Sequence, residues 1–430
     1  MTQMEICLLI FGLTLVGFVI RKLPMWAVAL AAMTALYLTG CNSEADTLGC
    51  FTNTNTLLMG TMMILSLGFS STSLASRLCR GVMRLTRGHF LGAYFGYLLV
   101  AVVLSNLISS PLAVYVIVSA MLKTLCDENE KSRSQYMFPL MVVCLASAGI
   151  LPLANAISST ASTNGLIQSY GFEGITMQVT DSFRGRWPAL ALLLVWAVFI
   201  GPRFTPKQPV MTRLIESKPG PEKKKRALSP FSDWAGIVIF LGAVVCMVLS
   251  DKLRLPQWCI AMIASLLMVF FGVVDHKNAL REVPWDMLLL YAGSLALGTA
   301  LVNTGAGAMV GNALADMLGD HPNNYLMGTI FFLIPFLLTQ FMLNRSVNSI
   351  FTQICLLTCA SLGANPIGPL MLVRAGALTA FLTPMATSAV PLCMADGGYD
   401  LRALLKAGFL VILLLPPVYI FYIMTVFPAF

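Results

Sequence analysis

Charged residues and histidines are scarce in this chain. Asp, Glu, Lys and Arg make up 11% of its 430 residues, and it has three His, whereas a soluble domain carries about a quarter charged residues. Its 11 Cys lie scattered, mostly in apolar runs, without a C-x-x-C pair. These shortages exclude an ordinary soluble domain. They also leave no cluster of metal ligands and no catalytic constellation that would indicate an enzyme.

Long apolar runs take the place of charge. Hydrophobic residues make up 57% of the chain, and its mean hydropathy is +0.81. A membrane core of about 30 Å needs about 20 apolar residues per helix, whereas membrane β-barrels show short alternating segments. We therefore predict an all-α polytopic protein of the plasma or inner membrane. The ten predicted crossings are residues 4–20, 24–40, 54–73, 135–157, 188–202, 235–250, 256–274, 285–303, 367–382 and 404–426.

Two longer apolar stretches do not fit single crossings. Residues 90–125 are apolar on both sides of Ser105-Asn106, and residues 324–361 are apolar on both sides of Asn344-Arg345. We interpret each stretch as a re-entrant hairpin of two half-length helices. Such hairpins are tolerated only where protein or a water-filled cavity satisfies the backbone at the tip. The alternative is two ordinary crossings with a Ser/Asn kink.

The order of these elements is the same in both halves of the chain. An amphipathic stretch precedes each hairpin, at residues 75–87 and 306–319, and Asn106 and Asn344 are predicted to hold matching places. Five crossings per half reverse the orientation, so we predict two inverted repeats, an architecture that many secondary transporters share. The predicted repeats are residues 1–202, with scaffold helices in 4–40 and transport elements in 90–165, and residues 234–430, with scaffold helices in 235–274 and transport elements in 324–396.

Basic residues predict the orientation in the membrane. Eight of the 27 Lys and Arg lie between residues 203 and 226, and short basic loops are cytoplasmic. Residues 203–233 are thus predicted to be a cytoplasmic linker, with both termini, Arg184 and Arg186 outside. The net charge of +8 is then a topology signal rather than a sign of nucleic-acid binding. Cys41 and Cys50 share one external loop and could form a disulfide.

Four polar clusters interrupt the apolar pattern, two in each half, at 105–111, 155–164, 344–349 and 383–388. Broken helices offer positive N-termini to an anion, and freed carbonyls with Ser, Thr and Asn oxygens suit Na⁺. The alternative is that small polar residues only let helices pack closely. No Asp or Glu lies within the clusters, which favours an anionic substrate. The predicted substrate-binding residues are Ser105, Asn106, Asn344, Arg345, Ser346, Thr383, Pro384 and Thr387, and those predicted for Na⁺ are Ser105, Asn106, Ser159, Thr160, Thr163, Asn164, Asn344, Ala386 and Thr387.

Two arginines lie within apolar stretches. A charged residue at membrane depth costs about 2.5–3.5 kcal/mol on insertion scales and is a functional candidate by default. Arg345, at the second tip, could bind a carboxylate or sulfate through two parallel hydrogen bonds, or it could be a structural or snorkelling arginine. Arg374, between Leu372 and Ala375, could be a second anion contact or part of a structural pair.

At these clusters the chain resembles the divalent anion:sodium symporter family, within the wider ion-transporter superfamily. That family carries Ser-Asn-Thr signatures at two hairpin tips, each followed by a broken helix. The resemblance implies an elevator-type homodimer in the lipid bilayer that moves a di- or tricarboxylate, with Na⁺ or H⁺ as the coupling ion and no other cofactor. The residues that carry it are Ser105-Asn106-Leu107, Pro284-Trp285-Asp286, Leu343-Asn344-Arg345, the stretch 380–387, Gly397-Gly398-Tyr399 and Lys406-Ala407-Gly408.

The chain departs from the family pattern at both tips. Each tip keeps Asn but lacks Thr, and the second has Arg345 where the family places residues near a sodium ion. A fixed guanidinium could stand in for one Na⁺. The sequence therefore leaves open anion exchange, or proton-coupled transport of sulfate or an arsenite-type oxyanion, without Na⁺.

Overall fold

The computed structural model describes most of the chain, and the described part consists of helices and loops without a strand. The predicted second surface helix, residues 306–319, and most of the linker 203–233 lie outside the described residues. The described residues are 2–20, 23–86, 89–108, 110–210, 229–248, 253–275, 285–307, 309, 323–340, 344–383, 387 and 389–430.

The first half begins with the two helices predicted as scaffold, and the elements predicted to carry the substrate follow later in the chain. Pro residues help to set the boundaries: Pro24 precedes the second helix and Pro111 opens the seventh, where a missing N–H costs nothing. The helices are α1 (Gln3–Ile20), α2 (Met25–Leu38), α3 (Glu44–Thr52), α4 (Thr54–Ser71), α5 (Leu74–Leu85), α6 (Phe90–Leu107), α7 (Pro111–Glu128), α8 (Arg133–Ala146), α9 (Ala154–Ser169), α10 (Asp181–Val195), the π-helical turn η1 (Trp196–Ile200) and α11 (Gly201–Phe204).

The second half is also built from long and short helices. Asn323 and Asp400 cap two of them by accepting hydrogen bonds from backbone N–H groups of the first turn. The described helices are α12 (Pro230–Val248), α14 (Gln257–Phe270), α16 (Trp285–Asn303), α18 (Asn324–Thr339), α19 (Asn344–Leu362), α20 (Ile367–Leu378), α21 (Ala389–Gly397) and α22 (Leu401–Val426).

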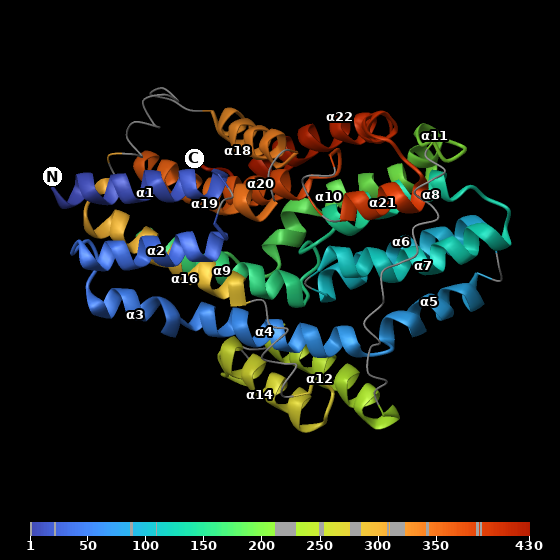
Figure 1. The fold of residues 1–430 in the computed structure, drawn as a ribbon, viewed down its shortest axis with the longest axis horizontal. Helices are drawn as coiled ribbons and strands as arrows, with labels where there is room; N and C mark the ends of the chain where they lie inside the picture. Colours follow the sequence, from blue (N-terminus) through green and yellow to red (C-terminus); the bar gives the residue numbers. More distant parts are fainter. Residues whose placement is uncertain are drawn as a thin grey trace.

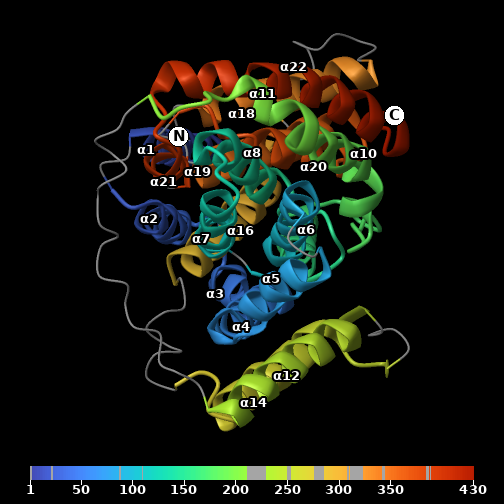
Figure 2. The same ribbon diagram turned by 90° about the vertical axis from the view of Figure 1, so that its right-hand side faces the viewer.

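The two halves are interleaved rather than side by side. Helix α2 packs along α16, and α14 packs along α4, so each of these pairs joins one helix of the first half to one of the second. In Figure 1, α1, α2 and α3 lie together at one end, and α9 lies near the middle. Figure 2 shows α12 and α14 as a pair on the far side of α4.

Several described helices suit a membrane. Four are long and apolar enough to cross it: Phe90–Leu107, Asp181–Phe204, Pro230–Met247 and Leu401–Val426. Two of the predicted crossings are interrupted: α8 ends at Ala146 before α9 begins at Ala154, and α20 ends at Leu378 before α21 begins at Ala389. Further apolar helices are 10 to 17 residues long.

Three expectations change in the first half. The predicted crossing 188–202 begins earlier, because α10, η1 and α11 form a continuous helical segment from Asp181 to Phe204. Helix α3 was not predicted; it starts with a reciprocal pair of hydrogen bonds between Ser43 and Asp46. The two helices of the first predicted hairpin, α6 and α7, are each 18 residues long, about 27 Å at the α-helical rise. By length, α6 therefore also fits the alternative of an ordinary crossing.

Cys41 and Cys50 do not form the disulfide that the sequence left open. Both residues are buried free thiols. The Cys41 thiol contacts the carbonyl of Gln3 at 3.6 Å, and the Cys50 thiol donates within its own helix to Asp46 O at 3.2 Å. Burial raises the pKa of the Cys50 thiol to about 11, so it is unreactive at neutral pH.

The surface helix predicted at 75–87 is present as α5. Its apolar side, with Leu78 and Val82, packs against the core, while Arg80 and Arg84 are exposed. Arg77 instead forms an ion pair of 2.5 Å with Asp233 at the start of α12. This pair ties the element before the first hairpin to the second half of the chain.

The close approach of α2 and α16 depends on Gly293. A Cβ at this position would lie 2.7 Å from the backbone carbon and oxygen of Ala29, and backbone cannot move aside as a flexible side chain can. We predict that Gly293→Ala lowers stability by about 1–3 kcal/mol, as overpacking does. Thermal unfolding in detergent measures this. The control, Gly242→Ala in α12, has nothing within 4 Å of the new methyl group. A fall of similar size in the control would contradict the packing argument.

Candidate functional site

The first broken helix is interrupted earlier than the sequence indicated. Helix α8 ends at Ala146 and α9 begins at Ala154. The polar run 155–164 is therefore helical, and the break precedes it. Two residues explain the position: Gly149 has a φ of +68°, which glycine adopts without the strain other residues would have, and Pro152 cannot donate a helical hydrogen bond.

The side chain of Asn106 connects the first tip to this break. It is fully buried, and its amide nitrogen donates to Val102 O at 2.8 Å and to Ser147 O at 3.0 Å. Its amide oxygen accepts from Leu151 N at 2.9 Å. Ser147 is the C-terminal cap of α8, so one side chain satisfies backbone groups on both sides of the interruption. We call this arrangement the Asn106 clip.

Gln340 makes the equivalent contacts in the second half. Its amide nitrogen donates to Phe336 O and to Thr379 O, both at 3.0 Å, and its oxygen accepts from Leu382 N at 3.3 Å. Thr379 is the C-terminal cap of α20. In both clips the amide nitrogen bonds the carbonyl four residues before it and the capping residue of the broken helix.

The residue that matches Asn106 is therefore Gln340, not Asn344. Asn344 begins α19, much as Ser110 precedes α7, and its side-chain oxygen accepts from the Thr339 hydroxyl at 3.1 Å. The sequence reasoning missed Gln340 because it searched for Asn at both tips. The signal was a carboxamide closing an apolar run, which occurs at both places.

Arg345 does not lie in an enclosed site. Its side chain is 60% exposed and its Nη1 lies 3.5 Å from an Asp286 carboxylate oxygen, itself on a side chain 50% exposed. The hydroxyl of Thr383 donates to Gln340 O, and that of Thr387 accepts from Ala389 N at 3.5 Å. Of the remaining predicted substrate and sodium residues here, Pro384, Ala386 and the side chain of Ser346 lie outside the described part.

The residues predicted for Na⁺ in the first half lie along α9 and beside the tip. Ser159 and Thr163 donate within the helix, to Ala156 O and Ser159 O. The hydroxyls of Ser105 and Thr160 are buried and have no partner in the described part of the chain. Asn164 is occupied: its side chain pairs with both backbone groups of Met177, at 2.9 Å and 2.8 Å.

A cavity of about 80 Å³ lies where elements of the two halves meet. Thr163 and Arg374 are the predicted residues that the structure brings to it. The sequence reasoning missed Arg186, which it placed outside; its side chain is 1% exposed and also lines the cavity. Helices α9, α10, α19 and α20 contribute its lining, and the polar lining residues are Ser162, Thr163, Ser182, Arg186, Asn348, Thr352 and Arg374.

Arg186 has a definite structural position. Its guanidinium donates to Ala146 O at 3.0 Å and Ala148 O at 3.3 Å, which are carbonyls left free where α8 ends. It also lies 5.7 Å from the centre of the Tyr419 ring, within the range of a cation–π contact. A positive charge at a helix C-terminus is stabilised by the helix dipole, so this arginine supports the broken helix.

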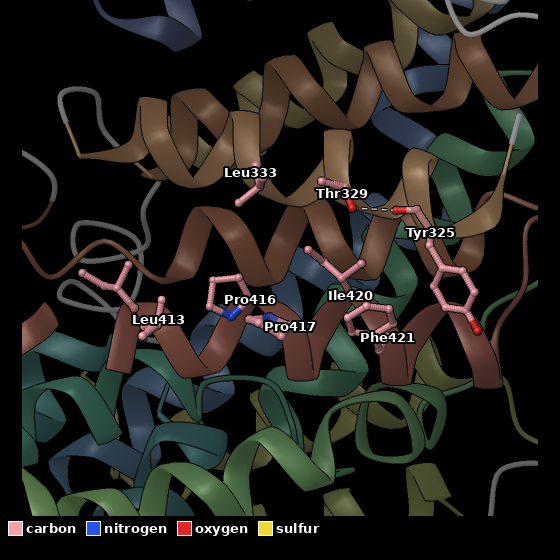
Figure 3. Close-up of a pocket in the computed structure, with 9 residues that line it drawn as sticks. Tyr325, Thr329, Leu333, Leu413, Pro416, Pro417, Ile420 and Phe421 are labelled. Carbon is pink, nitrogen blue, oxygen red and sulfur yellow. Dashed lines mark hydrogen bonds between the residues drawn. The ribbon is translucent and has the colours of Figure 1, made fainter. Parts of the chain in front are cut away.

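A second, larger pocket has a different character. It is a groove of about 330 Å³ between α18 and α22, and Figure 3 shows its apolar lining along the Pro416-Pro417 pair. The Thr329 hydroxyl there is already used, because it donates to Tyr325 O at 2.7 Å (Figure 3). Its lining is apolar apart from Tyr325 and Thr329, so the groove does not carry the anion argument.

Removal of either clip should leave buried backbone groups without partners. We predict that Asn106→Ala and Gln340→Ala each cost about 1–3 kcal/mol per orphaned group, seen as lower unfolding temperatures in detergent. Asn129→Ala is the control, because that side chain donates only to a carbonyl of its own helix end, Leu125 O. Unchanged unfolding temperatures for both clip variants would show that the clips do not hold the breaks.

Comparison with known proteins places the chain among transporters. It is 27% identical over 188 residues to the uncharacterized transporter YfbS of Escherichia coli, covering 44% of this chain and 30% of that protein. It is 22% identical over 320 residues to YflS of Bacillus subtilis, named a putative malate transporter, covering 71% and 65%. It is 21% identical over 170 residues to sodium/sulfate cotransporter 2 of Chlamydomonas reinhardtii, covering 39% and 19%. The match spans less than half the length of YfbS and of this cotransporter.

A solved structure shares the fold. The transporter MtrF of Neisseria gonorrhoeae superposes with a TM-score of 0.61 at 12% identity, covering 98% of this chain and 94% of that one. Residues 15–379 match the family described as citrate transporter. The chain therefore belongs to the citrate transporter family, as the resemblance to divalent anion:sodium symporters predicted, and is an integral multi-pass membrane protein among transporters rather than enzymes.

Proposed function

We propose that the chain is a secondary active transporter that moves a small di- or tricarboxylate across the membrane by an elevator mechanism. The observation that carries this proposal is the clip formed twice, by Asn106 and by Gln340. Each clip joins a hairpin tip to a broken helix. Broken helices are tolerated at membrane depth where they line a site or are buried in protein, and transporters place substrates at such interruptions.

The helix contacts support two inverted repeats. If α14 corresponds to α2 and α16 to α4, the two pairs α2–α16 and α14–α4 exchange under one pseudo-twofold axis. The clips relate α6 to α18 and α8 to α20 in the same way. In this proposal the scaffold holds a homodimer, while the hairpins and broken helices move together with the substrate.

Charge supports an anion as the substrate. The cavity between the halves is lined by two arginines and, in its described lining, by no Asp or Glu. The basic linker 203–233 is proposed to be cytoplasmic, with both termini outside. The coupling ion is proposed to be Na⁺, as the names of the cotransporter relatives motivate; Ser105 and Thr160 are candidate ligands because their buried hydroxyls lack partners.

A second candidate is anion exchange, or proton-coupled transport of sulfate or an arsenite-type oxyanion, without Na⁺. The exposed pair of Arg345 and Asp286 favours it, because a guanidinium at the second tip would occupy the surroundings of one sodium ion.

Uptake into proteoliposomes tests the function. We expect radiolabelled succinate or citrate to accumulate when an inward Na⁺ gradient is imposed, and excess unlabelled anion to compete. Uptake that needs an opposing anion or a pH gradient, and not Na⁺, would support the second candidate. The absence of uptake and exchange of succinate, citrate, sulfate and arsenite would refute anion transport.

The role of Arg345 can be tested by measuring both the unfolding temperature and the uptake kinetics of a substituted protein. Its ion pair is exposed, and exposed pairs contribute about 0–1 kcal/mol, so Arg345→Gln should leave the unfolding temperature nearly unchanged. If Arg345 contacts the anion, KM for uptake should rise about tenfold or more, as the loss of a charge-assisted hydrogen bond would cause. Asp286→Asn breaks the same pair without removing the guanidinium and is the control. Equal kinetics for the two variants would assign Arg345 to the pair alone.

A further inference from the structure

We propose that Arg186 and Arg374 together hold a carboxylate group of the transported anion in the cavity between α9, α10, α19 and α20. This inference rests on the proposed function and uses neither the tip residue Arg345 nor the apolar groove, since neither contributes to the lining of this cavity. The inference is based on hydrogen-bond donors in the cavity that have no acceptor among the described residues.

Arg374 lies beside the interruption of the first broken helix. Its guanidinium makes no hydrogen bond or ion pair with any described residue, and it lies against the break after α8. A Cβ at Gly149 would lie 2.6 Å from Arg374 Nη2, so the absence of a side chain there makes room for the guanidinium. The arginine is thus positioned closely, although nothing in the described chain neutralises it.

Arg186 adds a second positive charge to the same cavity. Its terminal nitrogens are used on the carbonyls of Ala146 and Ala148, but its buried Nε has no partner in the described part. Two like charges around one low-dielectric space repel each other more strongly than in water. An anion between them removes the repulsion and supplies the missing acceptor.

The neutral lining consists largely of hydrogen-bond donors as well. Ser182, Asn348 and Thr352 line the cavity, and their side chains make no hydrogen bond to other described residues. Ser182 and Thr352 are buried, and because buried polar groups are normally paired, their hydroxyls are available to a ligand or water. Water could satisfy the hydroxyls and the amide, but it could not neutralise two guanidinium groups.

The two guanidinium groups select the chemical group. The cavity of about 80 Å³ has room for a ligand group beside them. Guanidinium groups match a planar carboxylate through parallel hydrogen bonds, so we assign one carboxylate of the substrate to this cavity.

The position also couples binding to both halves. Arg186 supports the end of α8 in the first half, while Arg374 comes from α20 in the second. A carboxylate bound by both would join the two broken helices through one ligand. If the anion were bound by the tip residues alone, substitution of Arg186 or Arg374 would not weaken its binding.

Binding of succinate, citrate and sulfate to the purified protein tests this assignment, with isothermal titration and thermal unfolding as readouts. Arg374→Gln should weaken carboxylate binding about tenfold or more, the loss expected for a charge-assisted hydrogen bond. Without anion, its unfolding temperature should stay the same or rise, because an unpaired buried cation is removed. Arg374→Lys keeps the charge without the planar fork and should bind with intermediate affinity.

Arg184→Gln is the matched control. Arg184 lies on α10 two residues before Arg186, with its side chain 64% exposed, so its removal should leave anion affinity unchanged. Equal affinity in wild type and Arg374→Gln, or equal losses in Arg374→Gln and Arg184→Gln, would overturn this site while leaving the transport proposal intact. If the wild type binds none of the three anions, both the site and the proposed function fail. Binding of sulfate alone would overturn the carboxylate assignment.

Discussion

A backbone group inside a membrane-embedded protein must find a hydrogen-bond partner, because no solvent is there to supply one. The two broken helices are where this constraint is most severe. Where α8 and α20 end, carbonyls and N–H groups lose their helical partners. Asn106, Gln340 and Arg186 supply them from other segments. The described transport elements are arranged around these replacements.

Such side-chain contacts also join elements that are distant in sequence. Asn106 ends the first arm of one hairpin and contacts a loop more than 40 residues later. Gln340 does the same in the other half. Each of these side chains thereby joins the end of one apolar helix to a broken helix of the same half. Two further helix pairs, α2–α16 and α14–α4, connect the first half of the chain to the second.

Positive charge is distributed according to its role. Arg77 and Arg345 have carboxylate partners near the ends of helices, and Arg186 bonds carbonyls at a helix C-terminus. Arg374 has neither kind of partner among the described residues. This contrast sets Arg374 apart from the other arginines and is the basis of its proposed role in anion binding.

The sequence by itself determined the membrane class, most of the long described helices and the transporter family, because long apolar runs, proline positions and polar interruptions are local signals. Tertiary structure decided which polar residues meet. Gln340 could not be paired with Asn106 from the sequence, since their likeness lies in hydrogen bonds to segments about 40 residues away. Arg186 could not be placed beside Arg374 either: five residues into a helix it resembles a residue near the membrane surface, and only the packing of α10 against the end of α8 buries it.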